Sequence, residues 1–525
     1  MSSLLHPCTW NIKSSPDSQP YDYIVCGAGS AGCAVASRLS ENPKVRVLLL
    51  EAGGNGLALD ARVPAACGKL QTTQMDWADF IEPQAGVACT GFLDGKAFWP
   101  RGKGLGGSSL INYMAYVRGQ PADFDSWAAE CGDERWAFKH CLPAFERIER
   151  VGGGNPPACA SLGQRLFACH AQVRMRTCGT MGKKRPNLHV VCHILVNRIV
   201  FDANKRAVAV EYFVGNSTKP QTVRCSKEII LSCSAVGSPC VLLRSGIGSQ
   251  ADLAKFNIPV VVDNAEVGRN LQDHLAVLQL VREKPGKHCM AVNTSRAEHS
   301  PFPLLEWLFK GTGLLASSAY DASVFYPVHG TKMNDAQIGI FCSPGNEPIW
   351  NNIRVPTKTH VPGDMLAANG EGAILVPTLL HPQSRGSVQL RSANARDGPI
   401  IHANYLSTPG DFTTMVDICV QSAKLIKEMD LLGEIVVPKE VAHLPQDSRE
   451  LWEFMARNFC NTLYHPSSTC KIGLVVDSEL RVKHVTGLRV ADASIMPHLT
   501  SGNTNAPSIM IGERCAEFIA KNSML

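Results

Sequence analysis

The sequence predicts an α/β protein, α+β overall, with a Rossmann-like nucleotide-binding domain, and three stretches carry this prediction. A strand, a glycine-rich turn, a helix and a second strand follow one another over residues 21–54. Strand patterns return as a β-meander over residues 187–231, and a further strand with a closing helix occupies residues 488–520. A strand–turn–helix–strand unit is typical of a parallel sheet covered by helices.

The first stretch contains the glycine pattern of a dinucleotide site, GAGSAG at residues 27–32. Gly27 permits the tight turn, Gly29 lets a pyrophosphate approach the backbone, and Gly32 lets the helix pack close to the strand. The helix then offers free N–H groups and its positive dipole end to phosphates. Glu51 ends the second strand 24 residues after Gly27, where an acid accepts bonds from ribose hydroxyls. We expect an ADP-containing dinucleotide. The motif does not separate FAD from NAD, and a structural glycine turn is the alternative.

Composition sets the broad class. The 525 residues are 45% apolar and 18% charged with a net charge of +5, a globular balance that predicts two or more domains or one large interleaved unit. Basic stripes with interleaved aromatic residues are missing from the sequence, which argues against nucleic-acid binding. Apolar runs stay below the ~18 residues of a membrane span.

Cysteine usage and the chain ends bear on the compartment. The 20 cysteines are scattered without a CxxC pattern, so we expect no metal site and a reducing environment. A secretory leader is not visible. The terminal Ser523-Met524-Leu525 resembles a weak variant of the peroxisomal address. We expect an intracellular protein, cytoplasmic or organellar, with a peroxisome as one option.

A second glycine-rich loop follows at residues 101–113, RGKGLGGSSLINY. Its glycines give way to an apolar stretch, with small hydroxyl side chains at the junction. Such a loop suits close backbone approach to a flat or phosphorylated ligand. The spacing does not say which ligand, and a structural turn is the alternative.

The remaining elements follow from periodicity. We expect helical structure over 123–150, an irregular segment over 151–184, and helices over 410–430, 448–458 and 506–520. Strands are expected at 188–191, 194–201, 207–213, 228–231 and 372–380, and in SVQLRS (387–392) and LRVAD (488–492). A turn and short helix are expected over 234–248, and no clear pattern is visible from there to Gly370.

Several motifs together resemble the glucose–methanol–choline family of FAD-dependent oxidoreductases. They are GAGSAG with Glu51, GKGLGGSSLIN (102–112), VGRNLQDH (267–274), SAVGSPCVLLRSGIG (234–248), YHPSSTCKIG (464–473) and LRVADASIMPHLTSGNTNAPSIMIGE (488–513). The resemblance covers residues 20–520 apart from 151–184 and is nearest to the choline dehydrogenase and alcohol dehydrogenase-like branch.

The resemblance implies FAD rather than NAD and an interleaved architecture. The FAD-binding domain would comprise residues 20–150, 185–275 and 476–525, and the substrate domain, built on an antiparallel sheet, residues 276–475. Some relatives attach FAD through a His just before Asn112. Ile111 occupies that position here, so the resemblance implies non-covalent FAD.

By resemblance, Glu51 holds the adenosine ribose and Val196 supplies a backbone contact to adenine. Gly106, Ser109, Asn112 and Met114 are expected on the isoalloxazine side, and Asp492 at the ribityl or phosphate. The full set of expected cofactor residues is Gly27, Gly29, Ser30, Ala31, Gly32, Glu51, Ala52, Gly106, Ser109, Asn112, Tyr113, Met114, Ala115, Val196, Asp492, Ala493, Asn503 and Thr504.

The implied chemistry is oxidation of a primary alcohol, a CH–OH donor, to an aldehyde. The hydroxyl proton must be removed while a hydride moves to flavin N5, and a polar group must steady the developing alkoxide. His465 occupies the family's base position and Asn503 that of its partner. Because Asn cannot act as a base, it would orient the substrate oxygen. The sequence does not reveal the electron acceptor, which is oxygen, a quinone or an electron carrier.

Other candidates and functions are weaker. His381 is interpreted as structural, and Trp77 and Trp99 as core residues rather than a surface for a quaternary ammonium. The same fold includes non-redox hydroxynitrile lyases and fatty acid photodecarboxylases. Photodecarboxylases use a Cys and a basic residue where this chain has Leu380 and Ile400, which argues against that activity. An inactive flavoprotein is a third reading.

Residues 151–184 motivate that third reading. In the resembling family the same interval is several dozen residues longer and covers part of the flavin. Here it carries three consecutive glycines, two prolines and three cysteines, with too few apolar side chains to rebuild such a cover. We expect an exposed, irregular segment beside an open active site, and an enzyme that either accepts bulky substrates at reduced rate or is defective.

Overall fold

A computed structural model describes most of the chain. The described residues are 12–56, 58–84, 86–149, 185–284, 301–318, 320–330, 333–343, 372–429 and 432–522. The segment 151–184 and the terminal tripeptide 523–525, about which the sequence made predictions, lie outside the described residues.

An eight-stranded sheet forms the first half of the molecule, with the strand order β1-β6-β3-β2-β9-β8-β7 and β21 paired to β9. The parallel pairs are β1 with β6, β6 with β3, β3 with β2, and both β2 and β21 with β9. Strands β7 and β8 pair antiparallel. Strand β9 joins the two parts, because one stretch pairs with β8 and the other with β2 and β21. The bounds are β1 Ile12–Lys13, β2 Tyr21–Cys26, β3 Val47–Leu50, β6 Leu188–Val191, β7 Ile194–Phe201, β8 Ala207–Val214, β9 Gln221–Leu231 and β21 Leu488–Val490.

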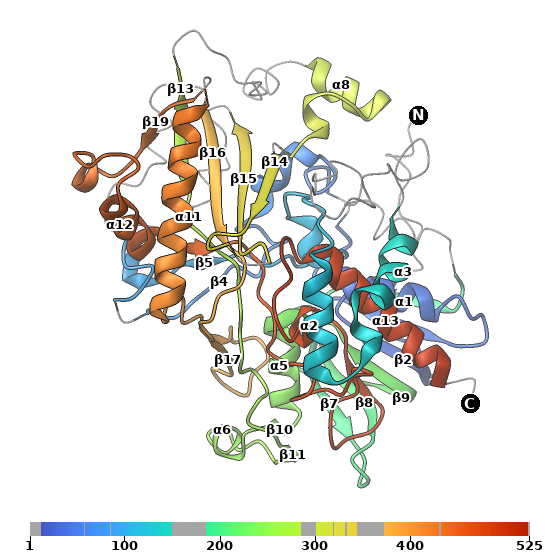
Figure 1. Cartoon of the computed structure of the whole chain (residues 1–525). Coiled ribbons are helices and arrows are strands. Elements are labelled where there is room, and N and C mark those ends of the chain that lie inside the picture. The colour runs from blue at the N-terminus through green and yellow to red at the C-terminus, as the bar shows by residue number, and fades with distance from the viewer. Residues whose placement is uncertain are drawn as a thin grey trace.

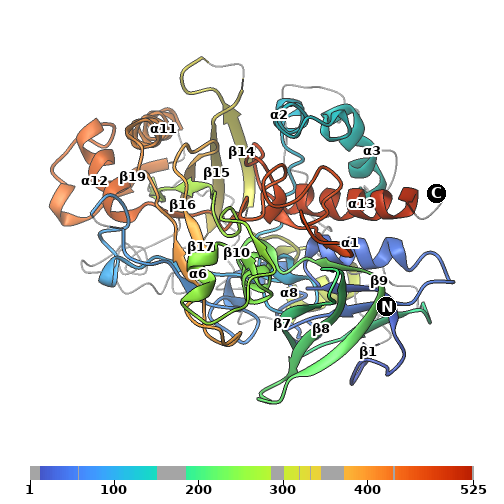
Figure 2. The same ribbon diagram turned by 90° about the horizontal axis from the view of Figure 1, so that it is seen from below.

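Two helices from opposite ends of the chain pack together on this sheet. Helix α1 (Ser30–Leu39) follows the glycine turn, and α13 (Asn505–Asn522) closes the described chain. They lie side by side in both ribbon views (Figures 1 and 2). A Cβ on Gly512 would come within 2.4 Å of the Ala31 carbonyl oxygen, so the contact depends on a residue without a side chain. The first and last helices of the described chain therefore stabilise one another.

A seven-stranded antiparallel sheet forms the second half. Its main path is β14-β15-β16-β12-β20. Off this path, β13 pairs with β16, and β19 pairs with β13. Figure 1 shows α11 lying along this sheet, with α12 beside it. The bounds are β12 Leu275–Ala276, β13 Gln279–Glu283, β14 Tyr320–Tyr326, β15 Ala336–Ser343, β16 Gly372–Leu379, β19 Leu432–Val436, β20 Asn461–Thr462, α11 Pro409–Glu428 and α12 Arg449–Phe459.

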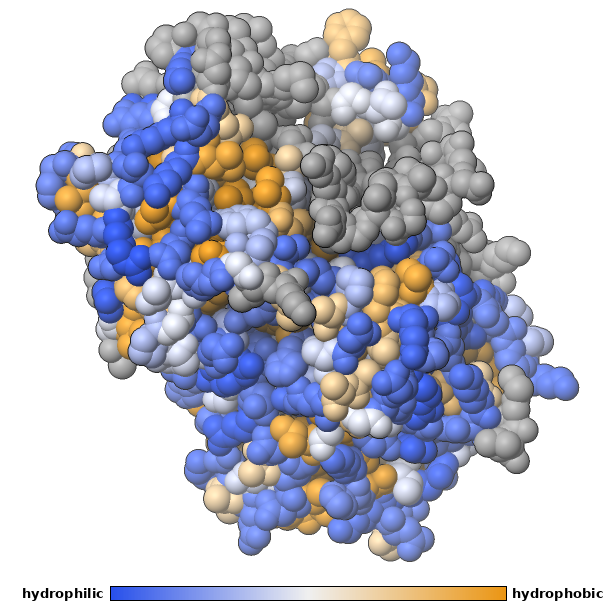
Figure 3. All heavy atoms as spheres, in the orientation of Figure 1, coloured by the Kyte–Doolittle hydropathy of each residue, from blue (hydrophilic) through white to orange (hydrophobic). Residues whose placement is uncertain are grey.

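Shorter elements connect the two sheets. The further helices are α2 Pro121–Cys131, α3 Phe138–Ile148, α5 Ser234–Arg244, α6 Gln250–Ala254 and α8 Pro301–Lys310. Two-stranded ribbons pair β4 Asp79–Phe80 with β5 Phe98–Trp99, β10 Ile247–Gly248 with β11 Val262–Asp263, and β17 Ser387–Gln389 with β18 Ile400–His402. Figure 3 shows a largely hydrophilic face, with hydrophobic side chains gathered beside α11 over the antiparallel sheet. The described helices include none that is long and apolar enough to cross a membrane.

Most predicted elements are confirmed, and the differences have clear causes. The helix expected over 123–150 is two helices, because the sequence between them turns through the short 3-10 helix Glu134–Trp136. The strand expected at 228–231 begins at Gln221, where its outer residues alternate between exposed and buried. The stretch before Gly370 that showed no pattern holds strands such as β14 and β15. The domain boundaries stay a prediction.

Candidate active site

A cavity of about 810 Å³ is lined by residues of both sheets. The eight-stranded sheet contributes the turn after β2, the end of β3 and the start of β7, and the antiparallel sheet contributes one face of β15 and β16. Loops after β20 and before α13 complete the wall. Most of the predicted site residues lie around this one space.

The glycine turn borders the cavity, and its three glycines differ in what surrounds them. A Cβ on Gly27, whose φ is +99°, would lie 2.3 Å from the Ser232 carbonyl oxygen, and one on Gly32 would lie 2.0 Å from the Gly27 carbonyl oxygen. A Cβ on Gly29 would meet nothing within 4 Å. Gly27 and Gly32 therefore serve close backbone packing, whereas Gly29 leaves open space at the cavity, as phosphate approach requires.

Two helices direct their N-termini at the cavity. Gly29 precedes α1 and Cys233 precedes α5, and neither makes a side-chain capping bond. Residues from the first turns, Ser30 and Ala31 of α1 and Ser234–Gly237 of α5, line the wall. Helix α1 has no side-chain capping bond, whereas in α5 the Ser234 N–H already donates to Asp492 and the Val236 N–H to Ser234 Oγ. Free N–H groups and the positive dipole end of a helix stabilise an anionic group. This end of the cavity suits a pyrophosphate.

Two buried carboxylates accompany these helix ends. Glu51 accepts hydrogen bonds from the backbone N–H groups of Ala28 (2.9 Å) and Gly53 (2.8 Å). Burial raises the pKa of Glu51 to about 7, against the opposing effect of these bonds. Asp492 accepts bonds from Ser234 N–H (3.0 Å) and Ser238 Oγ (2.6 Å), and burial also raises its pKa. Both acids line the cavity and fix the loops around it.

The second glycine loop reaches the cavity through part of its length. Asn112, Tyr113, Met114 and Ala115 line the wall, together with Ala52, Val196, Ala493, Asn503 and Thr504 from other segments. Gly32, Gly106 and Ser109 are not part of the wall, and their role toward the cofactor stays a prediction. The Ser109 hydroxyl turns inward to donate to the Gly106 carbonyl at 2.7 Å. Gly107 and Ser108 line the cavity instead.

His465 lies at the cavity between two polar partners. Its Nε2 is 3.3 Å from Nδ2 of Asn503, and its Nδ1 is 2.9 Å from Nδ1 of His274. The ring is nearly buried, with 8% of its surface exposed. Burial lowers the pKa of His465 to about 3, so the imidazole is neutral at physiological pH. A neutral imidazole with one free lone pair is able to accept a proton.

Backbone pairing brings these residues together. Strand β12 pairs with β20, and Gln272 bridges to Ser467. His274 and His465 lie between these contacts on facing segments. Asp273 accepts bonds from the His465 N–H (2.9 Å) and the Tyr405 hydroxyl (2.6 Å), and Trp99 donates to that hydroxyl at 2.7 Å. The motif VGRNLQDH therefore supplies Asp273 and His274, which hold His465 in place, a role that sequence reasoning missed.

One face of the antiparallel sheet forms the wall near His465. Phe341 pairs with Ile374, Gly339 with Val376 and Gln337 with Thr378, and all six residues line the cavity. Side chains in register on neighbouring strands project to the same face. Sequence reasoning missed this wall, because the segment containing β15 shows no clear periodicity.

The weaker candidates have ordinary structural contacts. His381 Nε2 is 2.9 Å from the Ser501 hydroxyl, which donates to Asp123 at 2.7 Å. Trp99 is buried, as the core interpretation predicts. Trp77 is only partly buried and lines the cavity, with the Lys103 ammonium 4.6 Å from its ring centroid, so the core interpretation is wrong for this residue. Within the described ranges, His, Cys, Asp and Glu form no group of three or more that could hold a metal ion.

The cavity fits an FAD molecule by the chemistry of its walls. The open space at Gly29 and the N-terminus of α1, which has no side-chain capping bond, suit a pyrophosphate, and Glu51 lies where ribose hydroxyls are bound in such folds. The loop 112–115 and His465 suit a flat ring system farther along. These features define a dinucleotide-binding oxidoreductase fold.

Comparison with known proteins identifies the family. The chain matches the family model GMC oxidoreductase over residues 21–182 and 153–276 in its N-terminal part and over 382–512 in its C-terminal part. The protein belongs to the glucose–methanol–choline (GMC) oxidoreductase family.

Relatives and solved structures agree with this assignment. The chain is 35% identical over 560 aligned residues to an oxygen-dependent choline dehydrogenase of Escherichia coli and 36% identical to that of Cronobacter sakazakii, each covering 95% of both chains. A pyridoxine 4-oxidase from Mesorbium loti is 27% identical with a TM-score of 0.76, over 95% of this chain and 98% of that one. A formate oxidase at 23% identity shares the fold, with a TM-score of 0.80, over 97% and 99% of the two chains.

The family membership establishes the enzyme class. The protein is an FAD-dependent oxidoreductase that acts on alcohol-type CH–OH donors. The fatty acid photodecarboxylase, hydroxynitrile lyase and inactive flavoprotein alternatives have no specific support in the described structure.

Proposed function

We propose that the enzyme oxidises a primary alcohol to an aldehyde with His465 as the base. The observation that carries this proposal is the placement of His465 at the cavity wall, with Nε2 directed to Asn503. The hydroxyl proton of the substrate passes to Nε2 of His465 as the carbon–oxygen double bond forms. FAD, when bound, accepts the hydride that leaves the same carbon.

Asn503 orients the substrate oxygen in this proposal. Its Nδ2 lies on the same side of the cavity as Nε2 of His465, so a hydroxyl placed between them accepts one bond and donates the other. The bond from Asn503 then stabilises the alkoxide as charge develops on the oxygen.

We also propose that FAD is bound without a covalent link. Ile111 precedes Asn112 and lines the cavity, and an aliphatic side chain forms no bond to a flavin. Acid or heat should release all of the yellow colour from the polypeptide, and colour that stays with the denatured chain would contradict this proposal.

Anaerobic stopped-flow reduction of the bound FAD tests the assignment of the base. His465→Gln should slow reduction by alcohol ~10²–10⁴-fold, since a general base is lost. Asn503→Ala should slow it roughly 5- to 10-fold, the equivalent of one hydrogen bond of ~1 kcal/mol. Each variant should retain FAD. If His465→Gln is reduced as fast as the parent enzyme, the assignment is wrong.

A further inference from the structure

We propose that His274 is the positioning residue that fixes the proton of His465 on Nδ1 and so keeps Nε2 free to accept the substrate proton. This inference rests on the proposed base role of His465. Its central observation is the 2.9 Å contact between the Nδ1 atoms of two buried histidines. Two neutral rings in such a contact share one proton, which resides on one Nδ1 and is accepted by the other.

The contacts of His465 decide which ring donates. The Asn503 atom nearest to His465 Nε2 is Nδ2, at 3.3 Å. An amide N–H donates, and from this contact we infer that Nε2 holds a lone pair. A neutral imidazole carries one N–H, and the proton of His465 is therefore on Nδ1, from which it is donated to His274 Nδ1. His274 then carries its own proton on Nε2, a buried atom that has no hydrogen-bond partner among the described residues.

The packing of the two rings supports a positioning role. His274 is fully buried, and its ring stands at 90° to that of His465 with a centroid separation of 5.0 Å. The Leu463 N–H donates to the His274 carbonyl at 2.8 Å, and the His465 N–H donates to Asp273 at 2.9 Å. Backbone bonds thus hold both residues, so the ring contact has little freedom to change.

The surrounding groups favour a neutral His274. Burial, followed by the charges of His465 and His381, lowers the pKa of His274 well below its usual value, while the carbonyl groups of Leu380 and Thr500 act in the opposite direction. The oxygens of the adjacent Asp273 are engaged by Tyr405 and the His465 backbone. A neutral acceptor at Nδ1 stabilises the imidazolium that His465 becomes after taking a proton.

A matched pair of variants separates this role from packing. In His274→Asn the amide oxygen stands near the position of Nδ1 and accepts the bond, whereas His274→Leu has almost the same shape and no acceptor. We expect His274→Leu to lower kcat on the order of 10²-fold with KM within about twofold, and His274→Asn to stay within about tenfold of the parent kcat.

Nitrogen-15 spectra of histidine-labelled holoenzyme supply a readout independent of turnover, with His465 assigned by the signals lost in His465→Gln. The parent should show His465 protonated on Nδ1, and His274→Leu should move the proton to Nε2. A parent enzyme with His465 protonated on Nε2 overturns the proposal whether or not the variants fold. Equal losses in both variants with an unchanged tautomer also overturn it. If the FAD of His465→Gln is reduced by alcohol as fast as in the parent, the base assignment is wrong, and the measured tautomer of His465 still stands.

Discussion

Glu51 combines burial with a role at the cavity, and this gives FAD binding a pH dependence. The pKa of Glu51 is raised to about 7 in the protein without cofactor. Ribose hydroxyls that donate to the carboxylate favour its ionised form and lower this pKa in the complex. Binding therefore releases a proton below pH 7, and we expect FAD affinity to fall as the pH drops from about 7 to 5, by up to tenfold per unit.

Fluorescence titration of FAD across this pH range measures the effect. Glu51→Gln has no proton to lose, so its affinity should be weaker at pH 8 and nearly independent of pH. An identical pH dependence in the parent and the variant would show that another group is responsible.

The glycines of the first turn lead to a second prediction about single residues. Gly29→Ala places a methyl group in open space at the cavity, so the variant should keep the parent's thermal midpoint without cofactor and bind FAD at least ~10-fold more weakly. Gly27→Ala forces the chain from a φ of +99° and drives a Cβ into the Ser232 carbonyl, so it should destabilise the fold itself. Calorimetry and FAD titration of both variants separate the two effects, and a Gly29→Ala enzyme with parental FAD affinity would contradict the phosphate assignment.

Residue-scale reasoning from the sequence selected the turn, Glu51, His465 and Asn503, which line one cavity, because short motifs fix their local geometry. Their roles toward FAD and substrate stay predictions. The roles of Gly106 and Ser109 toward the cofactor stay a prediction, because neither residue lines the cavity and the Ser109 hydroxyl donates to the backbone of its own loop. Sequence reasoning gave His274 no role of its own, because the pairing of β12 with β20 joins segments almost 190 residues apart.

At the scale of elements, the contact between α1 and α13 makes a testable claim. Gly512→Ala would bring a Cβ within 2.4 Å of the Ala31 carbonyl and 2.9 Å of Ala34 Cβ, so α13 must move and stability should fall by ~1–3 kcal/mol. FAD affinity should fall as well, because Ala31 and Asn505 line the cavity. Chemical denaturation and FAD titration measure the two effects.

Gly410 in α11 provides the matched control. A Cβ there would meet nothing within 4 Å, so Gly410→Ala should be neutral or stabilise by up to about 1 kcal/mol. If Gly512→Ala behaves like this control, the close contact between α1 and α13 is not important.

Elements with a clear hydrophobic periodicity were predictable from the sequence. Elements that mix buried and exposed apolar residues without such a periodicity were not. Helices α11 and α12 place apolar residues on one face at helical spacing. Strand β14 mixes buried Tyr320 with exposed Val324, and its identity comes from pairing with β15. Non-local pairing of this kind is not visible in a local window.

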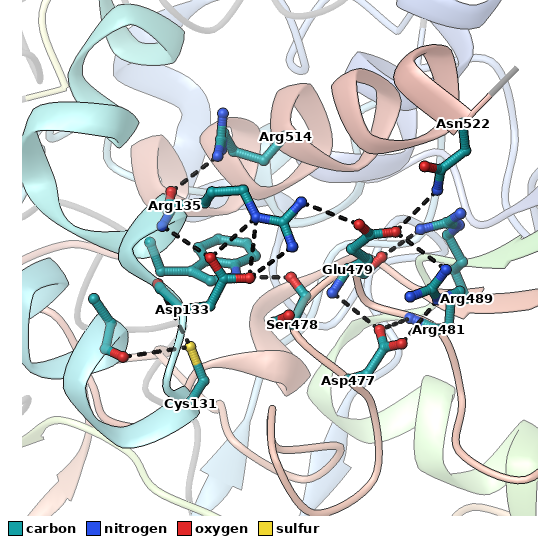
Figure 4. A network of polar contacts seen from close by, with 12 residues as sticks. Cys131, Asp133, Arg135, Asp477, Ser478, Glu479, Arg481, Arg489, Arg514 and Asn522 are labelled. Carbon is teal, nitrogen blue, oxygen red and sulfur yellow. Dashed lines mark hydrogen bonds and ion pairs between the residues drawn. The ribbon is translucent and has the colours of Figure 1, made fainter. Parts of the chain in front are cut away.

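At the scale of the molecule, a polar network joins segments from the N-terminal and C-terminal parts of the chain (Figure 4). Arg135, between α2 and α3, bonds to Asp133 and Glu479, and the Arg514 guanidinium of α13 donates to the Arg135 carbonyl at 2.9 Å. Asn522, near the end of α13, donates to Glu479 at 2.9 Å. The network therefore holds α13 against the loop that leads into β21.

Arg489 is the most buried charge of this network and makes the last prediction. Its guanidinium, 1% exposed, pairs with Glu228 of the neighbouring strand β9 and donates to the Glu479 carbonyl. Arg489→Met fills a similar volume but leaves Glu228, 25% exposed, without its partner. We expect the free energy of unfolding to fall by roughly 2–4 kcal/mol, below the full cost of breaking a buried pair because water reaches Glu228.

Arg481→Met removes a half-exposed Arg of the same network and should lower the free energy of unfolding by less than about 1 kcal/mol. Urea unfolding of both holoenzyme variants measures the difference, and equal losses would show that burial of Arg489 does not set its contribution.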